Sequence, residues 1–246
     1  MTGATSVFYT PYLHDGIVLW DGLDWLPTTF TQRTLALGTI INARPYDVFA
    51  FLSSGVVTLE LLAWTSDTVR ATDATLQDGR YCKAGDKTRL LLGTFYTTST
   101  TATADAETTR YLSNVYNQVQ KPCGRSFSHG GASHTYASVT ERNYNNSATD
   151  TAWNFVRTTT DGAFLLNAIS RADAGGVGNN AVVSFRVNGA NLPPILQNYN
   201  FLGLAASAFS YPVFGRVGRN DVIARQSQPV GTGTYYEATA FASLPC

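Results

Sequence analysis

The chain has 246 residues, with 17 Lys and Arg against 17 Asp and Glu, so its formal net charge at pH 7 is zero. This balance lacks the positive potential that attracts nucleic acids and anionic membranes, and we expect neither partner. No apolar run approaches the ~20 residues that cross a bilayer. The N-terminus also lacks the basic and then apolar regions of an export signal, so we expect no membrane insertion and no general export.

Charged residues make up 14% of the chain, about half of the ~25% in average globular proteins. The chain also has 13 Tyr, 13 Phe and abundant Thr, which favour β-structure because aromatic and β-branched side chains pack well on a pleated surface. We therefore predict an all-β fold and exclude a helical bundle. Cys82, Cys123 and Cys246 are widely spaced without metal-ligand spacing, so we expect ordinary thiols.

The first half consists of short apolar runs that are separated by turn residues, a pattern that predicts strands. These runs lie at residues 7–9, 17–20, 46–52, 56–64, 80–82 and 89–96. Ser53-Ser54-Gly55 and Gln77-Asp78-Gly79 are typical of hairpin turns. We predict a small β-meander.

One α-helix is predicted at about residues 105–120. Asp105 is a suitable N-cap, and apolar residues recur at the three- and four-residue spacing of one helical face. Pro122 then ends the helix, and the composition changes after it. We therefore predict a domain of residues 1–122 and a second domain of residues 123–246.

The second half is rich in Ser, Asn and Gly, and its apolar runs all predict strands. They lie at residues 134–139, 153–156, 163–169, 181–187, 202–209, 221–226 and 235–242. Between residues 181 and 187, Val183, Phe185 and Val187 alternate with Ser184 and Arg186, which predicts one buried and one wet face. This number of short strands is typical of a β-sandwich or jelly roll.

Titratable residues form no established catalytic motif. His129 and His134 flank a short loop and are either metal ligands, a Ser/His arrangement or surface histidines; without HExxH or GxSxG we interpret them as surface histidines. The Gly-rich residues 174–180 lead into a strand and not a helix, which favours a hairpin loop over a phosphate site. We predict no catalytic residue, cofactor or metal.

Carboxylates and tryptophans cluster near the N-terminus. Asp15, Asp21 and Asp24 lie beside Trp20 and Trp25, as in a sugar-binding platform or a glycosidase site. The same spacing also suits a solvated turn between two strands, and we prefer that interpretation.

Aromatic residues of the second half are the main candidates for ligand binding. They occur among Asn and Ser, a composition typical of adaptable binding surfaces, although core packing is the alternative for each of them. The candidates are Tyr136, Tyr144, Trp153, Tyr235 and Tyr236, with Tyr199 and Tyr211 nearby in the same composition.

A series of strand and turn motifs runs in fixed order through the first half. They are Tyr-Asp-Val-Phe at residues 46–49, Thr-Leu-Glu-Leu at 58–61, Trp64-Thr65, Arg70-Ala71, Gln-Asp-Gly at 77–79, Lys-Ala-Gly at 83–85 and Leu-Gly-Thr at 92–94. In these motifs, and in its opening strand and Trp-Asp-Gly turn, the chain resembles a group of tailed-bacteriophage virion proteins over roughly residues 6–122. It departs from the group's pattern at Leu90-Leu91 and at residues 112–114.

The resemblance implies a virion protein that is assembled in the host cytoplasm, with an anchoring first domain and a displayed second domain. Such proteins are fibres, spikes or head-decoration subunits that bind other capsid or tail proteins and a host-surface glycan. They are commonly homotrimers, and the apolar face of the predicted helix is the expected interface. Its residues are Tyr111, Leu112, Val115 and Val119.

Two other functions remain open. One is a cement or connector protein of the capsid or tail that makes no host contact. The other is a polysaccharide depolymerase that uses Asp15, Asp21 or Asp24, although the chain shows no repeat of the kind that forms a long β-helix.

Overall fold

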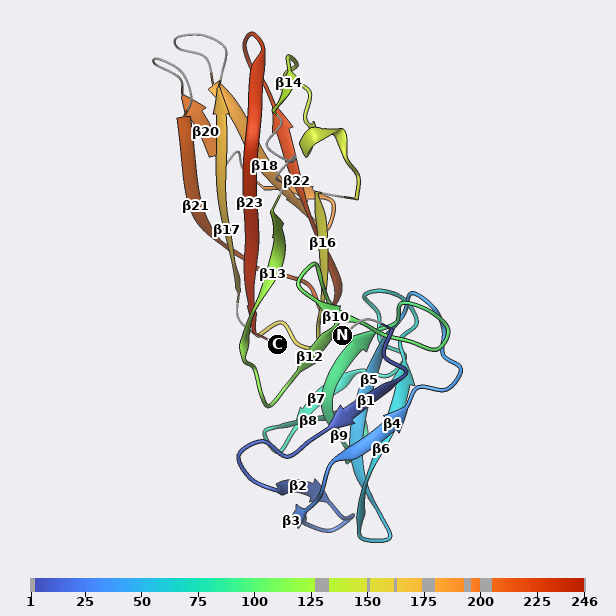
Figure 1. The fold of residues 1–246 in the computed structure, drawn as a ribbon. Coiled ribbons are helices and arrows are strands. Elements are labelled where there is room, and N and C mark those ends of the chain that lie inside the picture. The colour runs from blue at the N-terminus through green and yellow to red at the C-terminus, as the bar shows by residue number, and fades with distance from the viewer. Residues whose placement is uncertain are drawn as a thin grey trace.

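The computed structural model describes residues 3–126, 133–149, 151–161, 163–173, 180–192, 196–199 and 205–245. Across these ranges the protein is all-β, as predicted, with a 3-10 turn at Tyr144–Asn146. Figure 1 shows two β-rich bodies joined end to end, one formed by the first half and one by the second.

The first half is built around a six-stranded antiparallel sheet, counted over the described residues, in the order β6-β5-β9-β8-β7 with β12 also paired to β9. Two small hairpin-like sheets, β1-β4 and β2-β3, lie beside it. The strands are β1 Ser6–Tyr9, β2 Gly16–Trp20, β3 Trp25–Thr29, β4 Arg33–Ala36, β5 Pro45–Ser53, β6 Val56–Ala63, β7 Ala74–Gln77, β8 Arg80–Lys83, β9 Asp86–Tyr96 and β12 Leu112–Asn114. β7, β8 and β9 form the predicted β-meander, whereas the hairpin of β5 and β6 joins the sheet through pairing of β5 with β9.

The predicted hairpin turns are present in the first half. Ser53 pairs with Val56 across Ser54-Gly55, and Gln77 pairs with Arg80 across Asp78-Gly79. Asp78 has a φ of 53° and Gly79 a φ of 77°, which is the left-handed backbone that a two-residue turn between twisted strands requires.

The second half is a sandwich of two sheets, counted over the described ranges. The eight-stranded sheet has the order β10-β11-β16-β22-β18-β19, with β15 on β22 and β20 on β18. Its strands are β10 Asp105–Ala106, β11 Thr109–Arg110, β15 Arg142–Asn143, β16 Ala152–Arg157, β18 Asn180–Val187, β19 Ala190–Asn191, β20 Leu196–Tyr199 and β22 Gly218–Ser227. The five-stranded sheet consists of β13 Gln120–Ser126, β14 His134–Tyr136, β17 Phe164–Asp173, β21 Ala205–Val213 and β23 Gly233–Pro245.

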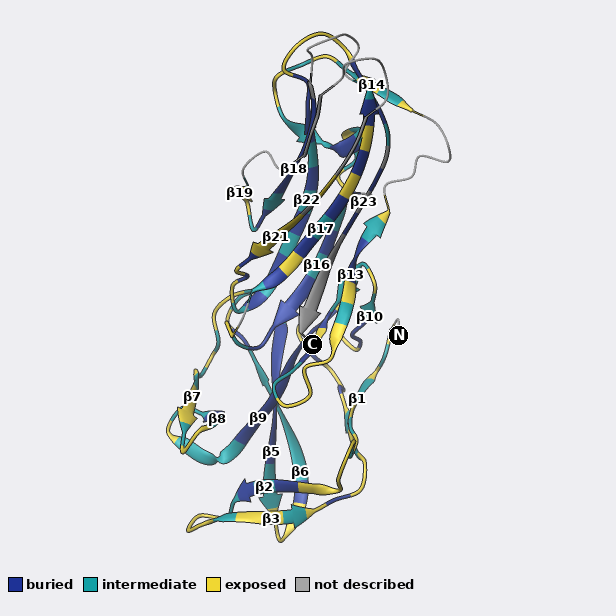
Figure 2. Ribbon diagram, turned by 90° about the vertical axis from the view of Figure 1, so that its left-hand side faces the viewer, coloured by how far each residue is buried: buried dark blue, intermediate teal, exposed yellow. Residues whose placement is uncertain are grey.

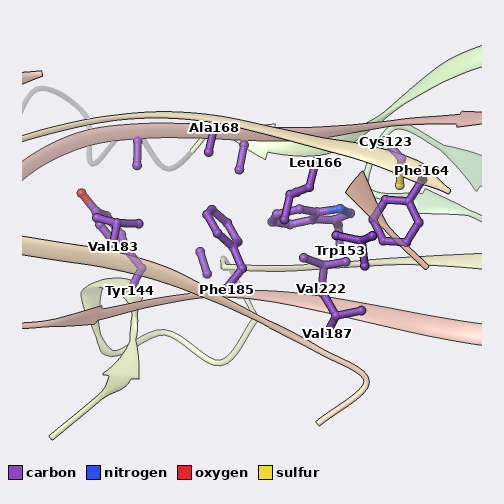
Figure 3. Packing of buried hydrophobic residues seen from close by; sticks show 14 of the residues in the cluster. Cys123, Tyr144, Trp153, Phe164, Leu166, Ala168, Val183, Phe185, Val187 and Val222 are labelled. Carbon is purple, nitrogen blue, oxygen red and sulfur yellow. The ribbon is translucent and has the colours of Figure 1, made fainter. Parts of the chain in front are cut away.

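Alternating side chains of the two sheets form one core. Phe164 and Leu166 of β17 face Trp153 of β16 and Phe185 of β18 across the sandwich (Figure 3). Burial alternates along β17 and along most of β22, as a strand with one inward and one outward face requires (Figure 2). This confirms the predicted inward face of residues 183–187, except that Ser184 on the opposite face is also buried and donates a hydrogen bond to Glu141.

The predicted helix at residues 105–120 is wrong, because this segment forms β10, β11, β12 and the first residue of β13. Leu112 pairs with Phe95 of β9, so sheet pairing overrides a helical preference that is weak by itself. Asn114 then accepts hydrogen bonds at Oδ1 from the backbone N–H groups of Tyr116 and Asn117, at 2.8 and 3.1 Å. Such a side-chain turn competes directly with helix formation.

None of the helical segments in the described part of the chain is long and apolar enough to cross a membrane. Cys82 is a buried thiol, and Cys123 is buried with its Sγ 3.7 Å from the carbonyl oxygen of Asn154. Cys246 lies outside the described residues.

Candidate functional site

The two halves meet at a contact that we call the junction. It consists of the loop of residues 64–70 from the first half and of residues 154–158 and 218–219 from the second. Arg219 donates its backbone N–H to the carbonyl oxygen of Asp67 at 2.9 Å. A Cβ placed on Gly218 would lie 2.1 Å from that same oxygen, so the backbones of the two halves are in direct contact.

A buried ion pair of the first half lies at the junction, and its arginine contacts the second half. Asp47 of β5 is fully buried, and its Oδ2 accepts a hydrogen bond from Nε of Arg70 at 2.7 Å. Nη2 of Arg70 donates to the backbone carbonyl of Thr158 at 2.7 Å, and the guanidinium stacks 4.5 Å from the ring centre of Trp64. Thr94 donates a further hydrogen bond to Asp47. Arg70 thus joins a carboxylate of the first half to the backbone of the second.

A second ionic contact lies beside the first. Nη1 of Arg219 is 3.4 Å from Oδ2 of Asp67, and Nη2 donates to Asn154 at 2.9 Å. The hydroxyl of Tyr96 donates to Oδ1 of Asp67 at 3.2 Å. Burial, followed by the charge of Asp67, raises the pKa of Tyr96 to about 12, so this hydroxyl remains a donor at neutral pH. Tyr96 also packs against Tyr111 and Val156.

Sequence reasoning missed the junction, although one signal for it was present. Asp47 stands inside the apolar run of residues 46–52, and a carboxylate in such a run is stable only when it is paired. Its partner Arg70 and the pair Asp67–Arg219 come from loops and from a strand end, where local patterns predict no contact.

The prediction of an exposed, ligand-binding aromatic side chain is wrong for three residues. Trp153 and Tyr144 are 0% and 1% exposed and belong to the sandwich core (Figure 3). Tyr235 is 0% exposed and belongs to the same core. Tyr136 and Tyr236 are half-buried, with Arg142 3.9 Å from the ring centre of Tyr136 and Arg171 5.9 Å from that of Tyr236. Ligand binding by Tyr136 and Tyr236 stays a prediction.

His134 belongs to the edge of the same core. Its ring stacks on Tyr235 with centres 5.5 Å apart, and its Nε2 is 2.7 Å from Oε1 of Gln226. These contacts of His134 are those of a residue that supports the fold. His129 and the Gly-rich residues 174–179 lie outside the described residues, as does the side chain of Tyr199. Over the ranges that are described, no three His, Cys, Asp or Glu side chains are placed to hold a metal ion.

The predicted oligomer-interface residues lie on strands and a turn instead of one helical face. Tyr111 is buried against Tyr96, with ring centres 4.9 Å apart, and is unavailable to a second subunit. Leu112 and Val119 are 41% and 49% exposed, and Val115 is half-buried. An interface through these three residues stays a prediction.

The Asp and Trp residues near the N-terminus lie in and beside the exposed turn between β2 and β3. Oδ1 of Asp21 accepts the backbone N–H groups of Leu23 and Asp24, and these hydrogen bonds lower the pKa of Asp21. Lys87 and Arg80 lie 4.8 and 4.7 Å from the ring centres of Trp20 and Trp25, respectively. Cations therefore cover the rings, which agrees with a structural turn.

No protein-family model and no curated protein sequence matches the chain. Among solved structures, the insecticidal delta-endotoxin Cry8Ea1 from Bacillus thuringiensis is 10% identical, with a TM-score of 0.32 over 90% of this chain and 46% of that one. BuGH86 in complex with neoagarooctaose is 12% identical, with a TM-score of 0.27 over 82% and 28%. Dimeric latent PorU from Porphyromonas gingivalis is 12% identical, with a TM-score of 0.27 over 84% and 24%. The chain spans less than half the length of these proteins, and the scores support no inference about function.

Proposed function

We propose that this protein is a structural subunit of a tailed-phage particle, displayed on the virion as a fibre, spike or decoration protein and contributing to attachment at the host surface. The resemblance of residues 6–122 to phage virion proteins motivates the proposal. The first half would bind the capsid or tail, and the second would face outward.

The observation that carries the proposal is the junction. A displayed domain serves attachment best when its orientation is fixed, since several copies must then meet one surface together. The hydrogen bond from Arg70 to the Thr158 carbonyl, the ion pair Asp67–Arg219 and the backbone contact at Gly218 supply that restraint. The two partners of each of these contacts come from different halves, so the contacts form in only one relative orientation.

Weak contacts by single subunits would add up through a homotrimer and through the many copies on a virion. The trimer is part of the proposal, with Leu112, Val115 and Val119 as its interface. The proposed function includes no enzymatic activity. Sedimentation of the purified chain tests the trimer directly.

A reconstruction of the particle of a phage whose genome encodes this chain tests the proposed function. We expect density that projects from the capsid or tail, with the first half against the particle and the sandwich distal. Density that lies flat between capsid or tail subunits, with both halves covered, would reject host attachment and favour a cement protein. A particle without the chain would reject both.

A further inference from the structure

A concave surface in the first half lies apart from the junction. The loop that connects β1 to β2 forms one wall, and the turn after β12 forms the other. The groove between them has a volume of about 490 Å³, within the range of roughly 300–1,000 Å³ that is usual for small-ligand sites. Its size therefore suits a small molecule or one short segment of a polymer.

Aromatic rings supply the apolar part of this groove. Tyr9 and Phe30 stack with centres 4.8 Å apart and planes within 3°, and Phe30 is 6% exposed, so this pair forms a fixed base. Tyr12 is 73% exposed and Phe8 is 53% exposed, which leaves much of each ring in contact with solvent. Exposed aromatic rings at the edge of a groove are suited to stack on a flat apolar ligand surface.

The polar residues that line the groove are of uncharged types. None of its lining residues is Asp, Glu, Lys or Arg; the polar lining includes His14, Asn114 and Asn117. The side-chain turn at Asn114 holds the wall of residues 114–117 in place by accepting hydrogen bonds from Tyr116 and Asn117. Amide and imidazole groups on a fixed wall can exchange hydrogen bonds with hydroxyls.

We propose that this groove binds an uncharged carbohydrate. A sugar ring presents an apolar C–H face, which would stack on Tyr12, and hydroxyls, which would hydrogen-bond to His14 and Asn117. A charged ligand would lose hydration without gaining an ion pair from the lining. The inference goes beyond the proposed function, which sets the first half against the particle, because the binding is a property of the isolated chain. It places glycan contact in the first half, whereas the sequence predicted it in the second.

Saturation-transfer NMR on the purified full chain tests the inference, with cellotetraose, maltotetraose and tetra-N-acetylchitotetraose as probes. We expect at least one probe to receive saturation and Tyr12→Ala to weaken its binding by about tenfold or more, the size of loss expected for a stacking aromatic. His14→Ala is a second variant with the same expected direction. Phe214→Ala is the matched control, because Phe214 is 79% exposed and does not line the groove. We expect it to bind as the unmodified chain does.

Three results would overturn the inference. The first is that none of the probes binds, and the second is that Tyr12→Ala binds as well as the unmodified chain. The third is that Tyr12→Ala changes the sedimentation coefficient, which would make the groove an interface between copies. Particle location is measured separately, so sugar binding by a chain that lies flat in the particle would reject the proposed function and leave the groove assignment intact.

Discussion

Gly218 is the position at which the junction is most sensitive to a small change. Its φ is +89°, and a Cβ added there would lie 2.1 Å from the carbonyl oxygen of Asp67 and 2.9 Å from the Trp64 ring. Because the nearer atom belongs to the backbone, no rotamer change can relieve the contact. Gly218→Ala must therefore move the loop of residues 64–70 away from β22.

The expected loss of folding free energy in Gly218→Ala has two parts. A left-handed backbone costs a residue with a Cβ roughly 1–2 kcal/mol relative to glycine. Forcing an extra carbon into a packed contact costs typically about 1–3 kcal/mol. Their sum of roughly 2–5 kcal/mol is a large share of the about 5–15 kcal/mol by which domains are stable.

Gly189 provides the matched control, since its φ is +83° and no atom lies within 4 Å of an added Cβ. Gly189→Ala should show the backbone cost alone. Urea unfolding followed by tryptophan fluorescence measures both variants, and hydrogen exchange of residues 64–70 should rise in Gly218→Ala only. Equal destabilisation of the two variants, with unchanged exchange, would refute the packing argument.

Three other predictions concern buried groups. Asp47→Asn should lower the free energy of unfolding by about 3–5 kcal/mol in urea titrations, because Arg70 would keep a buried charge. Glu60→Gln removes a charge from a more exposed pair and should lower the free energy of unfolding clearly less. Equal losses in the two variants would contradict this reasoning. Burial raises the pKa of Cys82 to about 11, so Ellman's reagent at pH 8 should modify it slowly unless urea is present; rapid modification of the folded chain, located by peptide mapping, would argue against this. The pKa of Cys82 is raised to about 11 and that of Tyr96 to about 12, so folding favours the protonated form of both groups. Their contribution to stability should be full below pH ~9 and should be lost as the pH rises toward ~12. A free energy of unfolding that does not change over this pH range would contradict the prediction.

Local chemistry explains which parts of the fold could be predicted. Asp78-Gly79 requires positive φ at both positions, and few residues satisfy a two-residue hairpin so well, so its turn was recognisable without tertiary information. The helix failed for the opposite reason. The spacing of Tyr111, Val115 and Val119 matches one helical face, but the pairing of Leu112 with Phe95 is a long-range contact that the spacing does not encode.

The candidate site was harder to predict, because its contacts join distant segments. Asp67 and Arg219 are separated by 152 positions, and nothing in either neighbourhood signals the other. Trp153 and Tyr235 show a related difficulty. An aromatic residue in a polar, Asn-rich sequence is compatible with either face of a strand, and only the register against neighbouring strands decides that both point inward.

The path of the chain adds to the restraint that the junction supplies. After β9, which belongs to the sheet of the first half, β10 pairs with β11, and β11 pairs with β16 in the second half. β12 then returns to pair with β9, and β13 enters the sandwich. Residues 105–122 therefore connect the halves through strand pairing on both sides instead of through a free linker. Rotation of one half against the other would have to break ladder hydrogen bonds, the Arg70–Thr158 hydrogen bond and the Asp67–Arg219 ion pair. A force applied to the sandwich would therefore reach the first half through several strands at once, which suits the proposed display function.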